Sequence, residues 1–338
     1  MPITSVWLSK TCTALINGDA MKIGLIDVDS HNYPNLPLMK LSAYHKRQGD
    51  KVEWYDTFEH YDLVYMSKVF NSSPDYRYVI NADKIIRGGT GYAIAGGGGE
   101  SYDKSIDKPL PDEIEHIYPD YSLYGITDTA YGFLTRGCPR GCSFCIVGKK
   151  EGLCSRKVAD LSEFWSGQKN IVLNDPNILA CREWKDLFSQ LHDSRASIDF
   201  NQGLDIRLMT EEKALALSKL KIKEIHFAWD VYEDKQKVLP RLKMFAEVCK
   251  KKPPSHNCIV YVLVNHTSTL EQDLERIYTL RELGYWAYVM IYDKKNADHV
   301  YIDLQRWCNN RFIFARCPRF EDYNKQERED KRQLTLNF

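Results

Sequence analysis

The stretch RGCPRGCSFC, residues 136–145, places Cys138, Cys142 and Cys145 within eight positions of one another. The glycines and the proline between them allow a short loop to turn its thiols inward. A structural zinc site takes four ligands, usually as two separated pairs, and no fourth Cys or His stands beside this C-x3-C-x2-C spacing. Three thiolates can instead hold three irons of a cubic iron–sulfur cluster and leave the fourth iron open. The spacing therefore predicts a [4Fe–4S] cluster.

The seven other cysteines stand singly along the chain. They are Cys12, Cys154, Cys181, Cys249, Cys258, Cys308 and Cys317. We expect them to be small apolar packing residues, because thiols stay reduced in the cytoplasm and an isolated Cys is most often buried.

The composition is that of a globular protein with no strong charge bias. The chain has 338 residues, 43% of them hydrophobic, and its 46 basic residues balance 46 acidic ones. The balance gives no indication of a nucleic-acid or membrane partner. Because no apolar run is long enough to span a bilayer and the first 20 residues lack a secretory signal, we expect a cytoplasmic protein.

The first part of the chain predicts a small Rossmann-like α/β domain over residues 21–103. Its predicted elements are a strand at 21–30, a helix at 37–48 and strands at 51–56, 61–70 and 83–89. Residues 1–20 are predicted to be a disordered extension, with Met21 as a candidate true start. The glycine-rich segment 88–99 is predicted to be a loop rather than a phosphate cradle, and the proline-containing segment 104–130 to be a linker.

A regular alternation of strands and helices follows over residues 131–310. The predicted strands are 131–136, 170–175, 197–205, 224–230, 258–265 and 286–293, and the predicted helices are 158–167, 183–192, 211–220, 233–251, 270–283 and 297–308. Six such units are too few for a closed eight-unit barrel, so we expect a six-unit partial (β/α) barrel. In such a fold the loops after the strands line one mouth, and the three cysteines follow the first strand. Residues 311–338 are predicted to be a solvated C-terminal tail.

On these residues the chain resembles the radical S-adenosylmethionine (SAM) superfamily. Its signature is CxxxCxxC with an aromatic residue before the last Cys, here Cys138, Cys142, Phe144 and Cys145. The resemblance implies that SAM chelates the open iron through its amino and carboxylate groups. It also implies that the reduced cluster cleaves SAM to methionine and a 5′-deoxyadenosyl radical, which takes a hydrogen atom from a substrate. A reductant such as flavodoxin or ferredoxin is implied as partner.

The resemblance also implies that polar residues at the ends of later strands bind SAM. They are Asn174, Asp175 and Asn177 after the second strand, Gln202, Asp205 and Arg207 after the third, Trp229 and Asp230 after the fourth, and Asn265 and Asp293 after the fifth and sixth. The usual Gly-Gly-Glu is absent, so Asp175 is expected to accept the SAM ammonium. Arg207 would bind its carboxylate, Trp229 would cover a ring, and Asp230 would bind a ribose hydroxyl. His226 is expected to be structural.

The small domain at 21–103 resembles in size and position the cobalamin-binding domain of some superfamily members. Asp29 and His31 match the Asp-x-His-x-x-Gly motif of many cobalamin proteins, but Pro34 replaces the Gly. The domain is also short of helices, so bound cobalamin is not favoured, and a role as substrate platform or lid is. Three readings stay open: a radical SAM enzyme of unknown substrate, a cobalamin-dependent radical SAM methyltransferase, and a non-catalytic iron–sulfur or zinc-binding adaptor.

Overall fold

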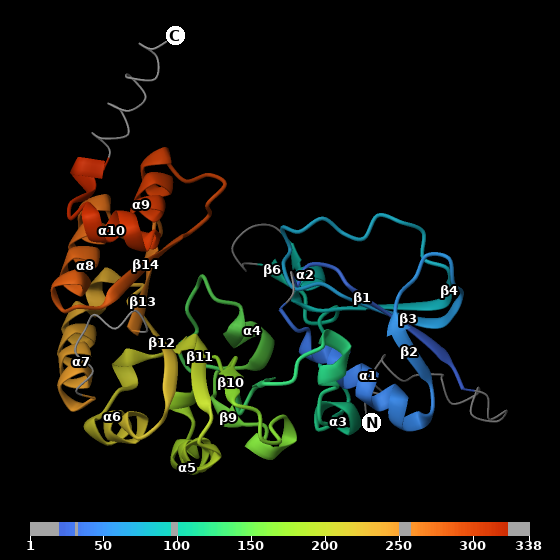
Figure 1. The fold of residues 1–338 in the computed structure, drawn as a ribbon. Helices are drawn as coiled ribbons and strands as arrows, with labels where there is room; N and C mark the ends of the chain where they lie inside the picture. The colour runs from blue at the N-terminus through green and yellow to red at the C-terminus, as the bar shows by residue number, and fades with distance from the viewer. Residues whose placement is uncertain (1–19, 31–32, 96–100, 250–257, 324–338) are drawn as a thin grey trace, which may run out of the picture. The chain divides into compact units, whose positions relative to one another are not determined.

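A computed structural model describes residues 20–30, 33–95, 101–249 and 258–323. The chain divides into two compact units, Met1–Ile198 and Asp199–Phe338. It is a mixed α/β protein with a four-stranded and a six-stranded parallel sheet (Figure 1). The expected α/β class is therefore confirmed. Cys12, His31 and the predicted extension up to residue 19 lie outside the described residues.

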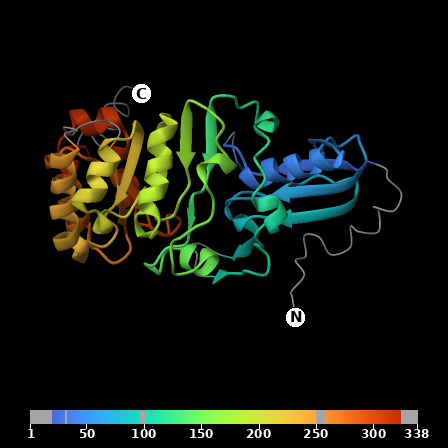
Figure 2. The same ribbon diagram turned by 90° about the horizontal axis from the view of Figure 1, so that it is seen from below.

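The four-stranded sheet has the order β2-β1-β3-β4, and every pair in it is parallel. Its strands are β1 (Lys22–Asp27), β2 (Lys51–Trp54), β3 (Tyr61–Ser67) and β4 (Ala82–Gly88). The helix α1 (Leu36–Gln48) joins β1 to β2 and lies along one face of the sheet (Figure 2). The Asn35 side chain caps its start, and Gly49, at φ 90°, ends it in the left-handed conformation.

The core of this sheet consists of apolar side chains from the strands and α1. Ile23, Leu25 and Leu63 pack against Leu38 and Leu41, and all five are almost fully buried. Alternate side chains of a strand share one face, so Ile23 and Leu25 lie with Leu63 on the face that packs against the helix, while Leu38 and Leu41 are at helical spacing on α1. Short elements follow: α2 (Thr90–Ala93), β5 (Ile94–Ala95), β6 (Ser101–Tyr102), α3 (Asp112–Glu115) and η2 (Tyr121–Tyr124).

The six-stranded sheet has the order β14-β13-β12-β11-β10-β7, in which neighbours along the chain are also neighbours in the sheet. Its strands are β7 (Thr129–Gly132), β10 (Asn170–Leu173), β11 (Ser197–Leu204), β12 (Ile222–Ala228), β13 (Cys258–Val264) and β14 (Trp286–Ile291). All six overlap the predicted strands. The strand β13 is buried along almost its whole length, whereas β7, β10 and β11 alternate between buried and more exposed residues.

Most of the predicted helices of this part are present. They are α5 (Trp184–Ser194), α6 (Glu211–Ser218), α7 (Lys235–Val248), α8 (Leu270–Glu282) and α9 (His299–Asn309), together with the short α4 (Val147–Glu151) and the single turns η4 (Ile178–Ala180), η5 (Ile206–Leu208) and η6 (Tyr232–Asp234). The predicted capping box of α8 is also present, between Thr269 and Gln272.

The predicted helix over residues 158–167 is wrong. The segment begins after β9 (Arg156–Lys157), which pairs antiparallel with β8 (Thr135–Arg136), and contains only the single turn η3 (Leu161–Glu163). Leu161 and Phe164 are three residues apart, as on one face of a helix, and both are buried, but the backbone between them forms only this single turn. Phe164 lies against Gly132, where a β-carbon would come within 2.4 Å of its ring.

The start of the predicted tail is folded where the structure describes it. Helix α10 (Arg311–Arg316) follows α9, and Phe320 is buried beside Trp307, with ring centroids 5.6 Å apart. Residues 324–338 of the predicted tail lie outside the described residues. Within the described ranges, no helix combines the length and apolar character needed to cross a membrane.

Candidate functional site

The three clustered cysteines lie on a loop whose two ends are held together. This Cys loop, residues 137–155, leaves β8 and returns into β9, whose pairs Thr135↔Lys157 and Arg136↔Arg156 form its stem. The side chain of Glu151 accepts from Arg136 Nη1 at 2.8 Å and from Gly137 N at 3.0 Å, and Cys138 N donates to Gly152 O at 3.1 Å. Glu151 thus fixes the point at which the chain enters the cysteine stretch.

Three glycines in the loop, Gly137, Gly141 and Gly152, have the positive φ angles that favour glycine. Gly137 has φ 87°, and a β-carbon there would lie 2.2 Å from the carbonyl oxygen of Cys154. Gly141 has φ 57° and more space around it. The close approach at Gly137 brings the Cys138 backbone against the returning strand of the hairpin.

The thiols of Cys138, Cys142 and Cys145 are half-buried, as is Phe144. The nine cysteines in the described ranges are thiols rather than disulfides, and of the singly placed ones Cys154 is exposed, Cys317 is intermediate and Cys181, Cys249, Cys258 and Cys308 are buried. Burial raises the pKa of the Cys181 thiol to about 11, so that this cysteine stays protonated.

A buried amide lies against the first of the three thiols. Asn177 Nδ2 donates to Cys138 Sγ at 3.4 Å, and the Asn177 carbonyl oxygen accepts from Ser155 Oγ at 2.8 Å. Asn177 is 1% exposed, and its Oδ1 has no hydrogen-bond partner among the described residues. A buried amide oxygen without a donor costs about 1–3 kcal/mol, which makes this atom a candidate acceptor for a bound group.

The donor set fits an iron–sulfur cluster, although the thiols are not gathered in this conformation. Within the part of the chain that the structure describes, no three His, Cys, Asp or Glu side chains are grouped to hold a metal ion. The three thiols share one loop with left-handed glycines, and an amide donor and an unsatisfied acceptor stand at Cys138. Metal binding would draw the sulfurs together, as is common where a site forms only with its ion.

Asp175 makes its contacts within the protein. Its two oxygens accept from Leu134 N at 3.2 Å, Thr135 N at 2.5 Å and Thr135 Oγ1 at 2.6 Å. Burial raises the pKa of this carboxyl to about 6. Asp175 therefore holds the chain just before the Cys loop, and its assignment to the SAM ammonium remains a prediction that these contacts do not favour.

Asn174 connects the strand end to the first sheet. Its Oδ1 accepts from the Tyr33 hydroxyl at 2.9 Å, and the Tyr33 ring packs edge-on against Tyr131 at 5.3 Å. Tyr33 belongs to the segment after β1 that contains the cobalamin-like pattern. Tyr33 could not be predicted from the sequence, because no pattern in it brings a residue after β1 next to one after β10.

The glycine-rich segment contacts α4, in the second half of the Cys loop. Lys150 Nζ donates to Thr90 Oγ1 at 2.6 Å and pairs with Asp107 at 2.8 Å. Asp107 is buried and also accepts from the Tyr102 hydroxyl at 2.9 Å. This contact anchors α4. The described part of the segment predicted to be a loop, 88–95, is instead the end of β4 followed by α2 and β5, and residues 96–99 lie outside the described residues.

In the second unit, the residues after β11 are already paired with one another. Arg207 Nε donates to Asp205 Oδ1 at 2.8 Å, and Arg207 Nη1 donates to Asp234 Oδ2 at 2.6 Å. Asp205 also caps η5 through Arg207 N. A guanidinium between two carboxylates has little attraction left for the carboxylate of SAM. Gln202, on the same strand, is exposed.

The residues after β12 are buried in a structural network. Trp229 is 1% exposed and its indole N–H donates to Val231 O at 3.0 Å, so its ring is part of the core. Burial raises the pKa of Asp230 to about 6. The fully buried Arg276 donates to the carbonyl oxygens of Trp229 at 2.6 Å and Asp230 at 2.9 Å. Arg276 thereby fixes the end of β12.

Asn265 and Asp293 end β13 and β14 in turns with positive φ, 60° and 45°. Asn265 Nδ2 donates to Tyr292 O at 3.0 Å, which ties one turn to the next. Short polar side chains tolerate this backbone, which accounts for their position without a ligand.

Asp29 is likewise engaged within the protein. Its oxygens accept from Val69 N at 2.7 Å and Phe70 N at 2.8 Å, and it is 3% exposed. It joins the end of β1 to the loop after β3. His31 lies outside the described residues, so its orientation is not described.

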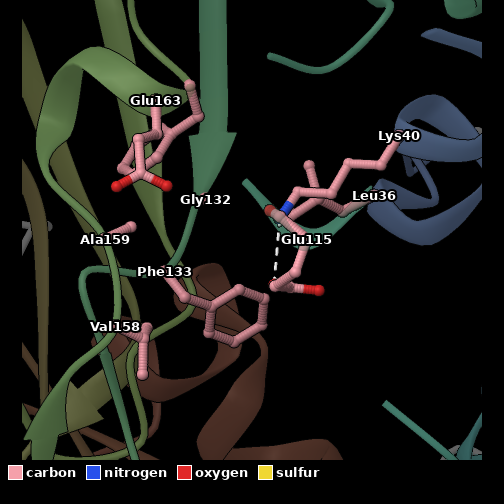
Figure 3. A pocket seen from close by; sticks show the side chains of 9 residues that line it. Leu36, Lys40, Glu115, Gly132, Phe133, Val158, Ala159 and Glu163 are labelled. Atoms are coloured by element: carbon pink, nitrogen blue, oxygen red, sulfur yellow. Dashed lines mark hydrogen bonds and ion pairs between the residues drawn. The ribbon is translucent and has the colours of Figure 1, made fainter. Parts of the chain in front are cut away.

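A cavity in the first unit lies between α1 and the segments around Gly132 and Phe164 (Figure 3). Lys40 reaches across it to Glu115, with Nζ and Oε1 2.9 Å apart. The enclosed space holds about one water molecule, which is far too small for SAM.

No protein-family model matches this chain, and no curated protein matches it significantly. A function must therefore be inferred from the residues described above.

Proposed function

We propose that this chain is a radical SAM enzyme and that its six-stranded sheet forms the partial (β/α)6 barrel of that superfamily. The observation that carries the proposal is the C-x3-C-x2-C loop with Asn177 against its first thiol and an unsatisfied Asn177 oxygen beside it. The loop follows the first strand of a parallel α/β sheet, where such folds place their chemistry.

When bound, the cluster and SAM would supply one-electron reductive chemistry and the removal of a hydrogen atom from substrate. Cys138, Cys142 and Cys145 would hold the cluster. Asn177 would donate to the Cys138 sulfur through Nδ2, which stabilises the thiolate, and accept from the SAM amino group through Oδ1.

Two carboxylates position the Cys loop without touching a reacting group. Glu151 holds Arg136 and Gly137 at the entrance of the loop, and Asp175 holds Leu134 and Thr135 just before it. Glu151 is not a predicted ligand, and Asp175, predicted to bind the SAM ammonium, is assigned here to positioning instead. Such positioning residues decide whether three thiols on a glycine-rich loop can converge.

The four-stranded sheet is proposed to be a platform rather than a cobalamin site. The carboxylate of Asp29 already accepts two backbone N–H groups, which accounts for its position without a ligating His. Tyr33 reaches Asn174 instead. A cytoplasmic location and a flavodoxin or ferredoxin as reductant belong to the same proposal.

Anaerobic reconstitution with iron and sulfide tests this function. Cys138→Ala, Cys142→Ala and Cys145→Ala should each lose the brown chromophore and reductive SAM cleavage. Cys154→Ala is the matched control, because Cys154 lies on the same loop and is exposed, and it should keep both. Full iron content in Cys142→Ala would contradict the proposal.

The same preparation separates the two other readings. A zinc or iron–sulfur adaptor would bind metal but leave SAM uncleaved in the presence of dithionite. A cobalamin-dependent methyltransferase would retain hydroxocobalamin in stoichiometric amount after desalting, as judged by corrin absorbance. We expect SAM cleavage and no retained corrin.

A further inference from the structure

A polar and aromatic cluster lies on one face of the second unit's sheet, away from the strand ends discussed above. Ile225 and Phe227 of β12 point to the other face, where Phe227 packs against Phe245 of α7 at 4.9 Å. The alternation of a strand puts Glu224 and His226 on the opposite face. The cluster consists of Asp199 on β11, Glu224 and His226 on β12, Tyr261 on β13 and Tyr288 on β14.

His226 organises this cluster. Its Nδ1 lies 3.1 Å from Phe200 O and its Nε2 lies 2.9 Å from Glu224 Oε1. A carbonyl oxygen can only accept, so Nδ1 donates to it, and the Nε2–Glu224 contact then requires one shared proton. The pair therefore carries no net charge. The imidazole ring is stacked on Tyr261, with centroids 5.0 Å apart and planes within 2°.

Asp199 is the member of the cluster whose hydrogen bonding is incomplete. Its Oδ1 is buried and has no hydrogen-bond partner among the described residues. Burial raises the pKa of this carboxyl and Glu224 raises it further, while His226 and Lys223 lower it. Because the His226–Glu224 pair is neutral overall, the carboxyl of Asp199 is the remaining acidic group of this cluster, and its Oδ1 is an acceptor without a donor among the described residues.

The aromatic members form a wall beside these groups. Tyr261 packs edge-on against Tyr288 at 5.8 Å, and burial raises the pKa of Tyr261 to about 12, so its phenol stays protonated. Tyr288 is 38% exposed. A partly open face that combines a carboxylate with tyrosine rings suits an organic cation, which gains both a charge-assisted hydrogen bond and a ring contact.

A metal ion suits this face poorly. Among the described residues, no three His, Cys, Asp or Glu side chains are grouped to hold one, and both nitrogens of His226 are already used. A protonated amine or amidine needs only one or two acceptors, which the face provides.

We propose that this face of the second unit binds a small molecule carrying a protonated amine or amidine next to a flat ring, with Asp199 as acceptor and Tyr288 as ring contact. That this ligand is the substrate rests on the proposed function. The binding site itself rests only on the residues of the second unit.

The probe is benzamidine, compared with neutral benzamide, and binding to the full-length chain without added iron or SAM is measured by titration calorimetry and ligand-observed NMR. Benzamidine should bind at least about tenfold more tightly than benzamide, since a charge-assisted hydrogen bond is lost in the neutral compound. Asp199→Asn and Tyr288→Ala should each weaken benzamidine by about tenfold. Glu282→Gln, an exposed carboxylate at the end of α8, should not weaken it.

Equal binding of benzamidine and benzamide, or tight benzamidine binding that survives Asp199→Asn, would overturn the proposal. So would saturable Mn²⁺ binding that disappears in Asp199→Asn. A thermal unfolding curve for each variant identifies any that does not fold, and Tyr288→Ala then provides the independent test. Because the assay contains neither cluster nor SAM, its failure is distinct from failure of the proposed function.

Discussion

Two turns in the first unit use the same device, a carboxylate just after a strand. Asp29 follows β1 and accepts from Val69 N and Phe70 N, whereas Asp175 follows β10 and accepts from Leu134 N and Thr135 N. Both carboxylates tie the end of one strand to the chain leaving a neighbouring strand. A strand-end Asp is thus explained by backbone satisfaction alone.

The two turns differ in the segments whose backbone N–H groups the carboxylates accept. Asp175 holds the residues that lead into the Cys loop, and Asn177, two positions later, contacts Cys138 and keeps one oxygen unsatisfied. At Asp29 the bonded loop leads to no cysteine. A predicted functional role is therefore better supported by an unsatisfied atom than by residue type at a strand end.

The largest expected effect is loss of the buried carboxylates. Asp29→Ala and Asp175→Ala should each lower the free energy of unfolding by about 2–4 kcal/mol, because each leaves two buried N–H groups without acceptors. Only Asp175→Ala should also lower the iron content after reconstitution. Urea unfolding monitored by circular dichroism and iron analysis measure the two effects.

Asp175→Asn is the control for shape, because the amide can still accept one hydrogen bond. It should fall between wild type and Asp175→Ala in stability. Equal loss of iron in Asp29→Ala would show that the two turns do not differ in the way described.

A second effect depends on pH. Burial raises the pKa of Asp175 to about 6, above the ordinary value of 3.8. Between about pH 4 and 6 the folded protein keeps this proton and the unfolded chain has lost it, so this contribution to stability is full below pH 4 and falls as pH rises through 6. Asp175→Asn removes the titration.

The stability difference between wild type and Asp175→Asn should therefore favour wild type more at pH 4.5 than at pH 7, by roughly 1–2 kcal/mol. Burial also raises the pKa of Asp230 to about 6, but Asp230 titrates in both proteins, so its contribution cancels in the stability difference. Urea unfolding at the two pH values gives the answer, and a constant difference would contradict the assignment.

The sequence predicts the strands well, either from a β-branched apolar run, as in the CIVYVLV segment of β13, or from alternation of apolar and polar residues, as in the SIDFNQGL segment of β11. It fails at residues 158–167, where Leu161 and Phe164 imitate a helical stripe. There, pairing of Arg156 with Arg136 and packing of Phe164 on Gly132 determine the backbone, and both involve partners about 20–30 residues earlier in the chain.

The sequence predicts which loop carries the candidate site, but not which side chains contact one another there. The sequence identifies Cys138, Cys142 and Cys145 by spacing, but it does not show that Arg207 is already paired with Asp205 and Asp234. Glu151 is missed for a similar reason. A single Glu after two lysines has no pattern until the two ends of the loop come together.

A third effect is on SAM affinity, and it compares Asn177 after β10 with Arg207 after β11. Asn177→Ala should weaken SAM binding to the reconstituted protein by about tenfold, because the acceptor beside Cys138 is removed. Arg207→Lys should leave that affinity within about twofold, since the guanidinium is occupied by two carboxylates. Equilibrium binding of SAM to each variant measures both, and the opposite ranking would return the role to Arg207.

The smallest expected effect concerns the contact between Tyr33 and Asn174. Tyr33→Phe removes one partly exposed hydrogen bond of 2.9 Å and keeps the ring against Tyr131. It should cost about 0.5–1 kcal/mol of stability by urea unfolding. A loss several times larger would show that the hydroxyl supports more of the turn after β1 than this bond.

The residues that contact the Cys loop become available early during translation. The loop is contacted by Thr90 and Asp107 before it, by Glu151 within it and by Asn177 after it, and Asp175 holds the residues just before it. All of them have left the ribosome long before α9 is synthesised. The groups that shape the loop are therefore present on the nascent chain while most of the second unit is still being translated.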